Sequence, residues 1–135
     1  MSFLADTGAD VTMIMPMDLV RFSVTFPQLQ NACEIYGVGG KAEAFKEDAI
    51  VTFVEPGFGL RIYTVEIQIM KPNQHIMNCP SLLGRDIMSK WNIAFDRSNN
   101  RISARVARAD HTIKFTKQMN GLEPLLGVRP PAPVI

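Results

Sequence analysis

The segment FLADTGADVT at residues 3–12 constrains the fold of this chain more than any other stretch. An apolar run ends at Asp6, a Thr and a Gly then turn the backbone, and apolar and polar residues alternate again from Val11. This order predicts a short strand, a turn and a second strand. We therefore expect the Asp6 carboxylate to lie at the edge of a core rather than fully in water.

An aspartate in such a turn indicates acid–base chemistry that needs a second carboxylate. Burial raises the pKa of a carboxyl group, and a neighbouring carboxylate raises one pKa of the pair further. One Asp cannot serve at once as general base and general acid in a hydrolysis, whereas two that share a proton can. Because the sequence contains one Asp-Thr-Gly turn, we expect the site to need two copies of the chain, with Asp6 as the catalytic residue of each.

Two further motifs lie downstream of this turn. Residues 35–40 read IYGVGG, and glycines supply the positive φ values that a short hairpin loop requires. Residues 81–86 read SLLGRD, which predicts a buried strand over 81–84 that continues into a helix over 85–91. The apolar residues of that helix fall on one face, which we expect to pack on the core: Ile87, Met88 and Trp91.

Together and in this order, the three motifs resemble the retropepsins, the retroviral-type aspartic proteases. The resemblance covers most of the first hundred residues. It implies a mainly β fold, a closed β-barrel of the acid-protease single-lobe type, with one short helix near the C-terminal part. It also implies an aspartic endopeptidase that acts on polypeptide substrates as a homodimer and needs no cofactor.

The resemblance implies a role for each motif. Thr7 would hydrogen-bond across the dimer, Gly8 would donate its backbone N–H to the carboxylate, and Ala9 would keep the cleft wall small. Arg85 would form an ion pair with Asp10 and so tie the helix to the turn. The glycine hairpin would be a flap that closes over the substrate, and its residues are Tyr36, Gly37, Val38, Gly39 and Gly40.

Plainer interpretations of the same residues stay open. Thr7 could satisfy only its own turn, and Arg85 could be a solvated residue at a helix start. The glycine hairpin at 37–40 could be an ordinary surface hairpin. For the whole chain, two other functions remain: a catalytically silent dimerisation or peptide-binding module of the same fold, or the protease segment of a retroelement polyprotein.

Short apolar runs with turn residues between them predict strands through the rest of the chain. We expect a helical turn at 17–22, an irregular segment or edge strand at 24–29, and a loop at 71–75. A rival helix over 97–108 would align four arginines into a basic stripe that could meet nucleic acid, but we favour solvated strand charges and expect no nucleic-acid partner. The expected strands are 11–15, 32–36, 41–45, 49–54, 63–70, 92–95, 101–106 and 111–115.

The length of 135 residues supports one domain with a core. We assign residues 1–108 to the protease domain and residues 109–135 to a C-terminal extension that ends in a proline-rich, extended or disordered tail. Retropepsins place strands before the catalytic turn, whereas five residues precede Asp6 here. We expect those strands to lie upstream or to come from another segment.

Composition excludes several other classes of protein. The formal net charge of +1 argues against a strongly electrostatic function, and 47% hydrophobic residues argue against general disorder. Cys33 and Cys79 form no metal-binding pattern, and we expect no metal. The two cysteines could form one disulfide, but we favour reduced thiols. His75 and His111 are expected at the surface. With no signal peptide and no apolar run of bilayer length, we expect a soluble, cytoplasmic or otherwise intracellular protein without membrane contact.

Overall fold

The structure, a computed structural model of the chain, describes residues 1–22, 28–37 and 40–116. The predicted tail over 121–135 and most of the predicted edge segment at 24–29 lie outside the described residues. The chain divides into two compact units. The first comprises Met1–Ala49 with Val65–Ala107, and the second comprises Ile50–Thr64 with Arg108–Ile135.

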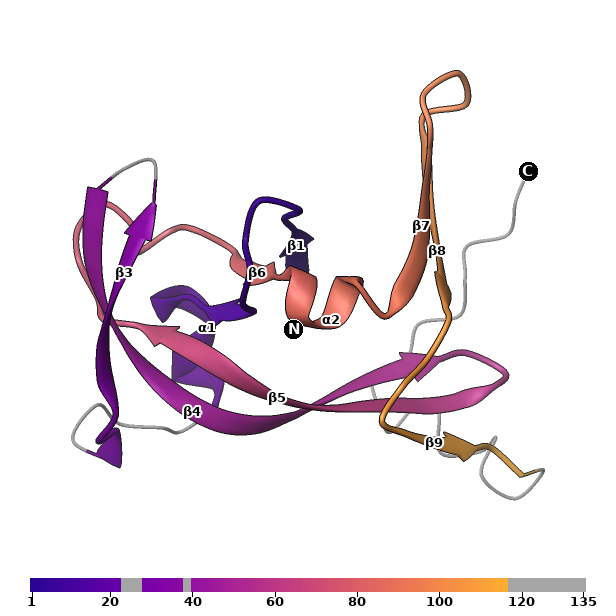
Figure 1. Cartoon of the computed structure of the whole chain (residues 1–135), viewed down its shortest axis with the longest axis horizontal. Coiled ribbons are helices and arrows are strands. Elements are labelled where there is room, and N and C mark those ends of the chain that lie inside the picture. Colours follow the sequence, from indigo (N-terminus) through magenta and orange to yellow (C-terminus); the bar gives the residue numbers. More distant parts are fainter. Residues whose placement is uncertain (23–27, 38–39, 117–135) are drawn as a thin grey trace. The chain divides into compact units, whose positions relative to one another are not determined.

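The first unit is built on strands that come from distant parts of the sequence (Figure 1). β1 and β6 pair in parallel, with Phe3 opposite Ser81 and Ala5 opposite Leu83. The strand order of the sheet is β1-β6-β2-β5-β4-β3. These strands are β1 (Phe3–Ala5), β2 (Met13–Ile14), β3 (Ala32–Gly37), β4 (Gly40–Glu55), β5 (Gly59–Met70) and β6 (Ser81–Leu83).

The two-residue strand β2 lies between β6 and β5. Met13 pairs antiparallel with Leu82 on one side and parallel with Gln68 on the other. The predicted strand over 11–15 is therefore shorter than expected, since the Thr12 N–H donates to the Asp86 carboxylate and the Met15 N–H donates to Ser81 Oγ instead of to a neighbouring strand. β2 thus places the residues that follow the Asp-Thr-Gly turn between β6 and β5.

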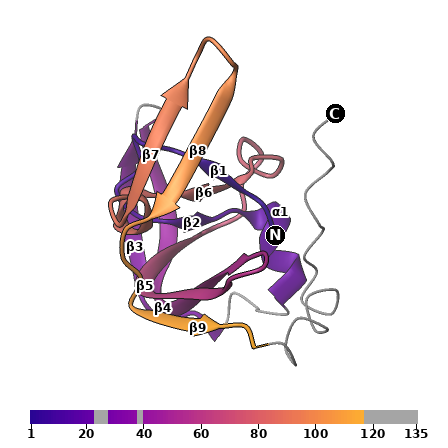
Figure 2. The same cartoon turned by 90° about the vertical axis from the view of Figure 1, so that its right-hand side faces the viewer.

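The second unit contains the outer half of the β4–β5 hairpin and the strand β9 (His111–Lys114), seen along β5 in Figure 2. Tyr63 is fully buried, and its ring meets Phe53 edge-on at a centroid distance of 5.8 Å. A Cβ at Gly59 would lie 2.0 Å from the carbonyl oxygen of Ile113, so only glycine lets β9 approach this closely. The strand predicted at 111–115 is confirmed by this pairing.

Helical structure is short, and the fold is mainly β as predicted. α1 (Pro16–Leu19) and the 3-10 turn η1 (Val20–Phe22) occupy the segment where a helical turn was expected. α2 spans Arg85–Met88, with Ile87 and Met88 buried. The prediction that this helix reaches Trp91 is wrong, because Trp91 begins the next strand and pairs with Val106.

β7 (Trp91–Asp96) and β8 (Arg101–Val106) form a separate two-stranded sheet. The prediction of two strands here is confirmed, and the rival helix over 97–108 is wrong. The cross-strand register places the large apolar residues on one face, with Phe95 opposite Ile102. Phe95 is 67% exposed and Ile102 is 71% exposed. In Figures 1 and 2 this hairpin extends away from β1, β6 and β2.

A cluster of buried side chains underlies the β3–β4 hairpin, with Met15, Ala44 and Met70 at its centre. Cys33 and Cys79 pack against this cluster as free thiols, in agreement with the prediction of reduced cysteines. Throughout the described part of the chain, every helix is too short or too polar to cross a lipid bilayer.

Candidate active site

Asp6 follows β1 directly, and its own turn holds its carboxylate. The Asp6 N–H donates to the Leu83 carbonyl oxygen at 3.1 Å, which fixes the end of β1 against β6. The Gly8 N–H then donates to Asp6 Oδ1 at 2.8 Å, and the Ala9 N–H donates to the Asp6 carbonyl oxygen at 3.2 Å. The half-buried carboxylate is therefore oriented before any partner binds.

The other residues of the turn differ in their exposure. Thr7 and Gly8 are exposed, whereas Ala9 is 8% exposed and belongs to the core. A Cβ at position 8 would lie 3.1 Å from Asp6 Oδ1, a tight contact with the group that the turn orients. The expected hydrogen bond of Thr7 across a dimer remains a prediction.

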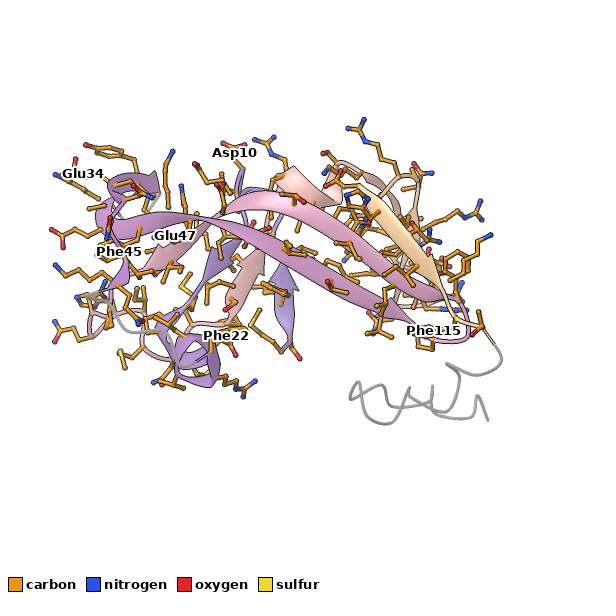
Figure 3. All side chains as sticks on the ribbon, turned by 90° about the horizontal axis from the view of Figure 1, so that it is seen from below. Asp10, Phe22, Glu34, Phe45, Glu47 and Phe115 are labelled. Carbon is orange, nitrogen blue, oxygen red and sulfur yellow. The ribbon has the colours of Figure 1, made fainter. Side chains whose placement is uncertain are left out.

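Arg85 and Asp10 form an ion pair between Arg85 Nη2 and Asp10 Oδ1. Both side chains are well exposed, at 58% for Arg85 and 77% for Asp10, and Figure 3 shows Asp10 pointing outward. Exposed pairs of this kind contribute about 0–1 kcal/mol to stability. The pair therefore connects α2 to the turn but contributes little to holding the two together.

Backbone hydrogen bonds join α2 to the same turn more firmly. The first N–H groups of a helix have no partner within the helix. Here the Arg85 N–H donates to the Ala9 carbonyl oxygen at 2.9 Å, and the Asp86 N–H donates to the Asp10 carbonyl oxygen at 3.1 Å. The helix start and the turn thus satisfy each other's backbone groups.

Gly84 allows this close approach. A Cβ at Gly84 would lie 2.4 Å from the Val11 carbonyl carbon and 2.7 Å from the Thr12 nitrogen. Both neighbours are backbone atoms, so no side-chain rotation could make room. The glycine of the SLLGRD motif is therefore explained by backbone packing behind the Asp-Thr-Gly turn.

Two residues of this junction carry side-chain contacts that the sequence did not predict. Thr12 has no exposed surface, and its hydroxyl donates to Asp86 Oδ1 at 2.8 Å. The Thr12 N–H donates to Asp86 Oδ2 at 3.0 Å. The available signal was weak: a single Thr within the apolar stretch from Val11 to Met15.

A second buried carboxylate lies on α1. Asp18 is 3% exposed and accepts a hydrogen bond from the Ser81 hydroxyl at 2.8 Å, while Ser81 Oγ accepts the Met15 N–H at 3.0 Å. Arg21 lies 3.4 Å from the other oxygen of Asp18. This network ties α1 to the first residue of β6 and so braces the strand that pairs with β1.

The proposed flap is described up to its tip. β3 pairs with β4 from Ala32 opposite Phe45 to Gly37 opposite Gly40, and Gly40 has a φ of +102°. Tyr36 is 76% exposed. Val38 and Gly39 lie outside the described residues. The strands of a glycine-tipped hairpin are thus present, and closure over a substrate remains a prediction.

No metal site accompanies these residues in the part of the chain that the structure describes, where no three His, Cys, Asp or Glu side chains are grouped to hold an ion. His75 and His111 are both exposed, as expected. The arrangement at Asp6 offers a carboxylate, a backbone donor and a surface turn.

The profile of a protein family described as retroviral aspartyl protease matches residues 1–96, well over half of the chain. The matched range includes the Asp-Thr-Gly turn, the glycine hairpin, the SLLGRD motif and β7. A search of curated proteins finds no match.

Proposed function

The chain belongs to the retroviral aspartyl protease family, and on that premise we propose that it is an aspartic endopeptidase whose catalytic dyad takes one Asp6 from each of two chains. The observation that carries this proposal is the oriented half-site. The Gly8 N–H donates to Asp6 Oδ1, and we assign Asp6 Oδ2 to the contact with water and substrate. Two such carboxylates facing each other would share one proton and hold a water between them.

The dyad would divide the work of peptide hydrolysis. The ionised Asp6 takes a proton from the water as its oxygen attacks the substrate carbonyl carbon. The protonated Asp6 of the second chain hydrogen-bonds to the carbonyl oxygen and neutralises the charge that develops there. A proton then passes to the leaving amine as the C–N bond breaks, and the dyad again holds one shared proton.

The apolar face of β7–β8 supports the dimeric form of the proposal. A two-stranded hairpin is marginal in water unless its apolar face is covered. Phe95 and Ile102 expose most of their surface in a single chain, and they belong to the same unit as Asp6. A second copy of the chain would cover this face and bring a second Asp6 turn.

The first test is cleavage of a mixed peptide library between about pH 4 and pH 7, the range over which carboxylate dyads change protonation. Wild type, Asp6→Asn and the remote variant Asp96→Asn are compared, with and without a pepstatin-type inhibitor. We expect inhibitor-sensitive cleavage by wild type and Asp96→Asn, and a loss of at least about 1,000-fold in Asp6→Asn. Full activity of Asp6→Asn would remove Asp6 from the mechanism.

A mixing experiment tests whether the site is shared. If both chains contribute an Asp6, excess Asp6→Asn chains recruit wild-type chains into inactive dimers, so wild-type activity falls as the variant is added. Specific activity should also fall on dilution, because dimers dissociate. Activity that is insensitive to both treatments would contradict the shared dyad. Peptide binding without cleavage in every sample would instead favour the silent binding module.

A further inference from the structure

Asp86 is the side chain on which the junction between α2 and the Asp-Thr-Gly turn converges. Its carboxylate accepts three hydrogen bonds: from the Thr12 N–H at 3.0 Å, from the Thr12 hydroxyl at 2.8 Å and from the Ile87 N–H at 2.9 Å. Both carboxylate oxygens are therefore engaged, and two of the three donors belong to one residue that lies 74 positions away in the sequence.

Thr12 also bonds to two other parts of the fold besides Asp86. Its hydroxyl donates to Asp86 and accepts the Gly84 N–H at 3.1 Å, so the single hydroxyl bridges the residues on either side of Arg85. The Thr12 carbonyl oxygen accepts the Gln68 N–H at 3.0 Å, which attaches the same residue to β5. Thr12 has no exposed surface, and water cannot replace these partners.

The geometry points to Asp86 as a positioning residue for Asp6, acting through Thr12 on the turn. The exposed Arg85–Asp10 pair is weak. The two carboxylate oxygens of Asp86 hold both the N–H and the hydroxyl of Thr12, in addition to the backbone bonds from Arg85 and Asp86 to the turn. Asp86 would thus set the direction in which the Asp6 carboxylate faces its partner.

This inference rests on the proposed function. The expected loss in kcat follows from the geometry that a shared dyad requires. Two carboxylates that share a proton need their oxygens within hydrogen-bond reach. A displacement of about 1 Å in a reacting group costs about 100-fold in rate. Removal of Asp86 should therefore lower kcat by about that factor while KM changes little, since the substrate-binding surface is untouched.

The chain offers a matched control for this test. Asp96 also accepts several hydrogen bonds, among them those from Ser98 Oγ, Asn99 N–H and Asn99 Nδ2, but all come from its own hairpin turn. Asp96→Ala removes these hydrogen bonds at the last residue of β7, whereas α2 precedes the first residue of that strand. We expect its kcat to match wild type within about twofold.

The experiment measures kcat and KM for Asp86→Ala, Asp86→Asn and Asp96→Ala, with dimer content and folding checked for each. Asp86→Asn keeps one acceptor oxygen in the same place, so we expect a loss of only about tenfold. It also keeps the test decisive if Asp86→Ala does not fold. Equal kcat in Asp86→Asn, Asp96→Ala and wild type would overturn the inference.

A double-mutant cycle separates positioning from general support of the fold. If Asp86 acts through Thr12, then Asp86→Ala combined with Thr12→Val should lower kcat no further than Asp86→Ala alone. Multiplied losses in the double variant would show that the two residues act independently, and the inference would fail.

Amide hydrogen exchange provides a readout that does not need catalysis. The Gly8 and Ala9 N–H groups are bonded to Asp6 and report the order of the turn. We expect both to exchange at least about tenfold faster in Asp86→Asn than in Asp96→Ala. If wild type shows no cleavage that depends on Asp6, the proposed function fails, and the exchange rates alone then decide whether Asp86 orders the turn. Unchanged rates would refute that role.

Discussion

Two aspartates in this protein each accept at least three hydrogen bonds but have different places in the fold. Asp86 draws two of its three from Thr12, 74 positions away, at a junction where backbone segments touch. Asp96 draws all of its bonds from residues two and three positions away, in the exposed turn of β7–β8. The comparison shows that a hydrogen-bond count says little about importance unless the sequence distance that each bond spans is considered.

The two aspartates differ because their hydrogen bonds close loops of very different length and compete with water to different extents. A bond between distant segments exists only after the chain has closed a long loop, and it then helps to hold two remote segments in register. A bond within a short turn closes almost no loop and competes with water on every side. The junction behind Asp6 should therefore be sensitive to small changes, and the β7–β8 hairpin should tolerate them.

The largest effect is expected at Gly84. Gly84→Ala places a Cβ against the backbone of Val11 and Thr12 at 2.4–2.7 Å, and overpacking against atoms that cannot rotate away costs about 3 kcal/mol. Denaturant unfolding should show a midpoint far below wild type. Gly37→Ala is the control, because an added Cβ there would meet no atom within 4 Å and Gly37 has no positive φ. A midpoint for Gly84→Ala equal to wild type would contradict the close packing.

Thr12→Val should rank second. The substitution keeps the shape of a buried side chain and removes the hydroxyl, which leaves the Gly84 N–H without its acceptor and Asp86 Oδ1 without one donor. A buried polar group left unsatisfied costs about 1–3 kcal/mol. Urea unfolding measures the loss. Thr12→Ser retains the hydroxyl and should recover a large part of the stability that Thr12→Val loses. A serine variant as unstable as the valine variant would assign the effect to packing instead.

Phe95→Thr should alter association more than stability. Because Phe95 is 67% exposed, its loss should change the free energy of unfolding of a single chain by less than about 0.5 kcal/mol. If a second copy covers this face, dimer affinity should fall at least about tenfold. Sedimentation over a range of protein concentrations measures the dimer affinity. Ala94→Thr, on the opposite face of β7, should leave association unchanged. Equal effects of the two variants would place the interface elsewhere.

Asp96→Ala should have the smallest effect. Hydrogen bonds from the Asn99 and Ser98 side chains hold the pKa of Asp96 below its ordinary value in the folded chain. A carboxylate of this kind stabilises the fold above the unfolded-state pKa, and the benefit disappears as pH falls through the folded-state pKa. The small stability difference from wild type at neutral pH should therefore narrow as pH is lowered through the acid range. Thermal unfolding across a pH series measures this, and a difference that grows in acid would reverse the sign.

The sequence was informative where local patterns decide structure. Alternation through Val65, Ile67 and Ile69 correctly predicted a strand and its buried face, although Gln68 and Met70 on the other face are buried too. The glycines at 37 and 40 correctly predicted a hairpin. The end of α2 was misjudged because Trp91 fits a helical face as well as it fits a strand, and its partner Val106 decides between them. Pairing with a distant strand overrides local periodicity.

The candidate site was likewise predictable only where its contacts join residues close in sequence. Asp6 and its turn could be assigned from a motif, because the hydrogen bonds that orient the carboxylate come from residues within three positions of it. The grip of Asp86 on Thr12 could not, because it joins residues from two motifs and follows from the parallel pairing of β1 with β6. Nothing in either segment alone specifies that pairing.

The parallel pairing of β1 with β6 also sets the order in which the chain can be assembled. Parallel strands cannot be joined by a tight turn, and pairing Phe3 with Ser81 requires the chain to have been made as far as β6. During synthesis from the N-terminus, Asp6 emerges well before β6 and α2, and its turn acquires its supports only when these elements follow. A nascent chain therefore carries Asp6 long before the contacts that hold its turn can form.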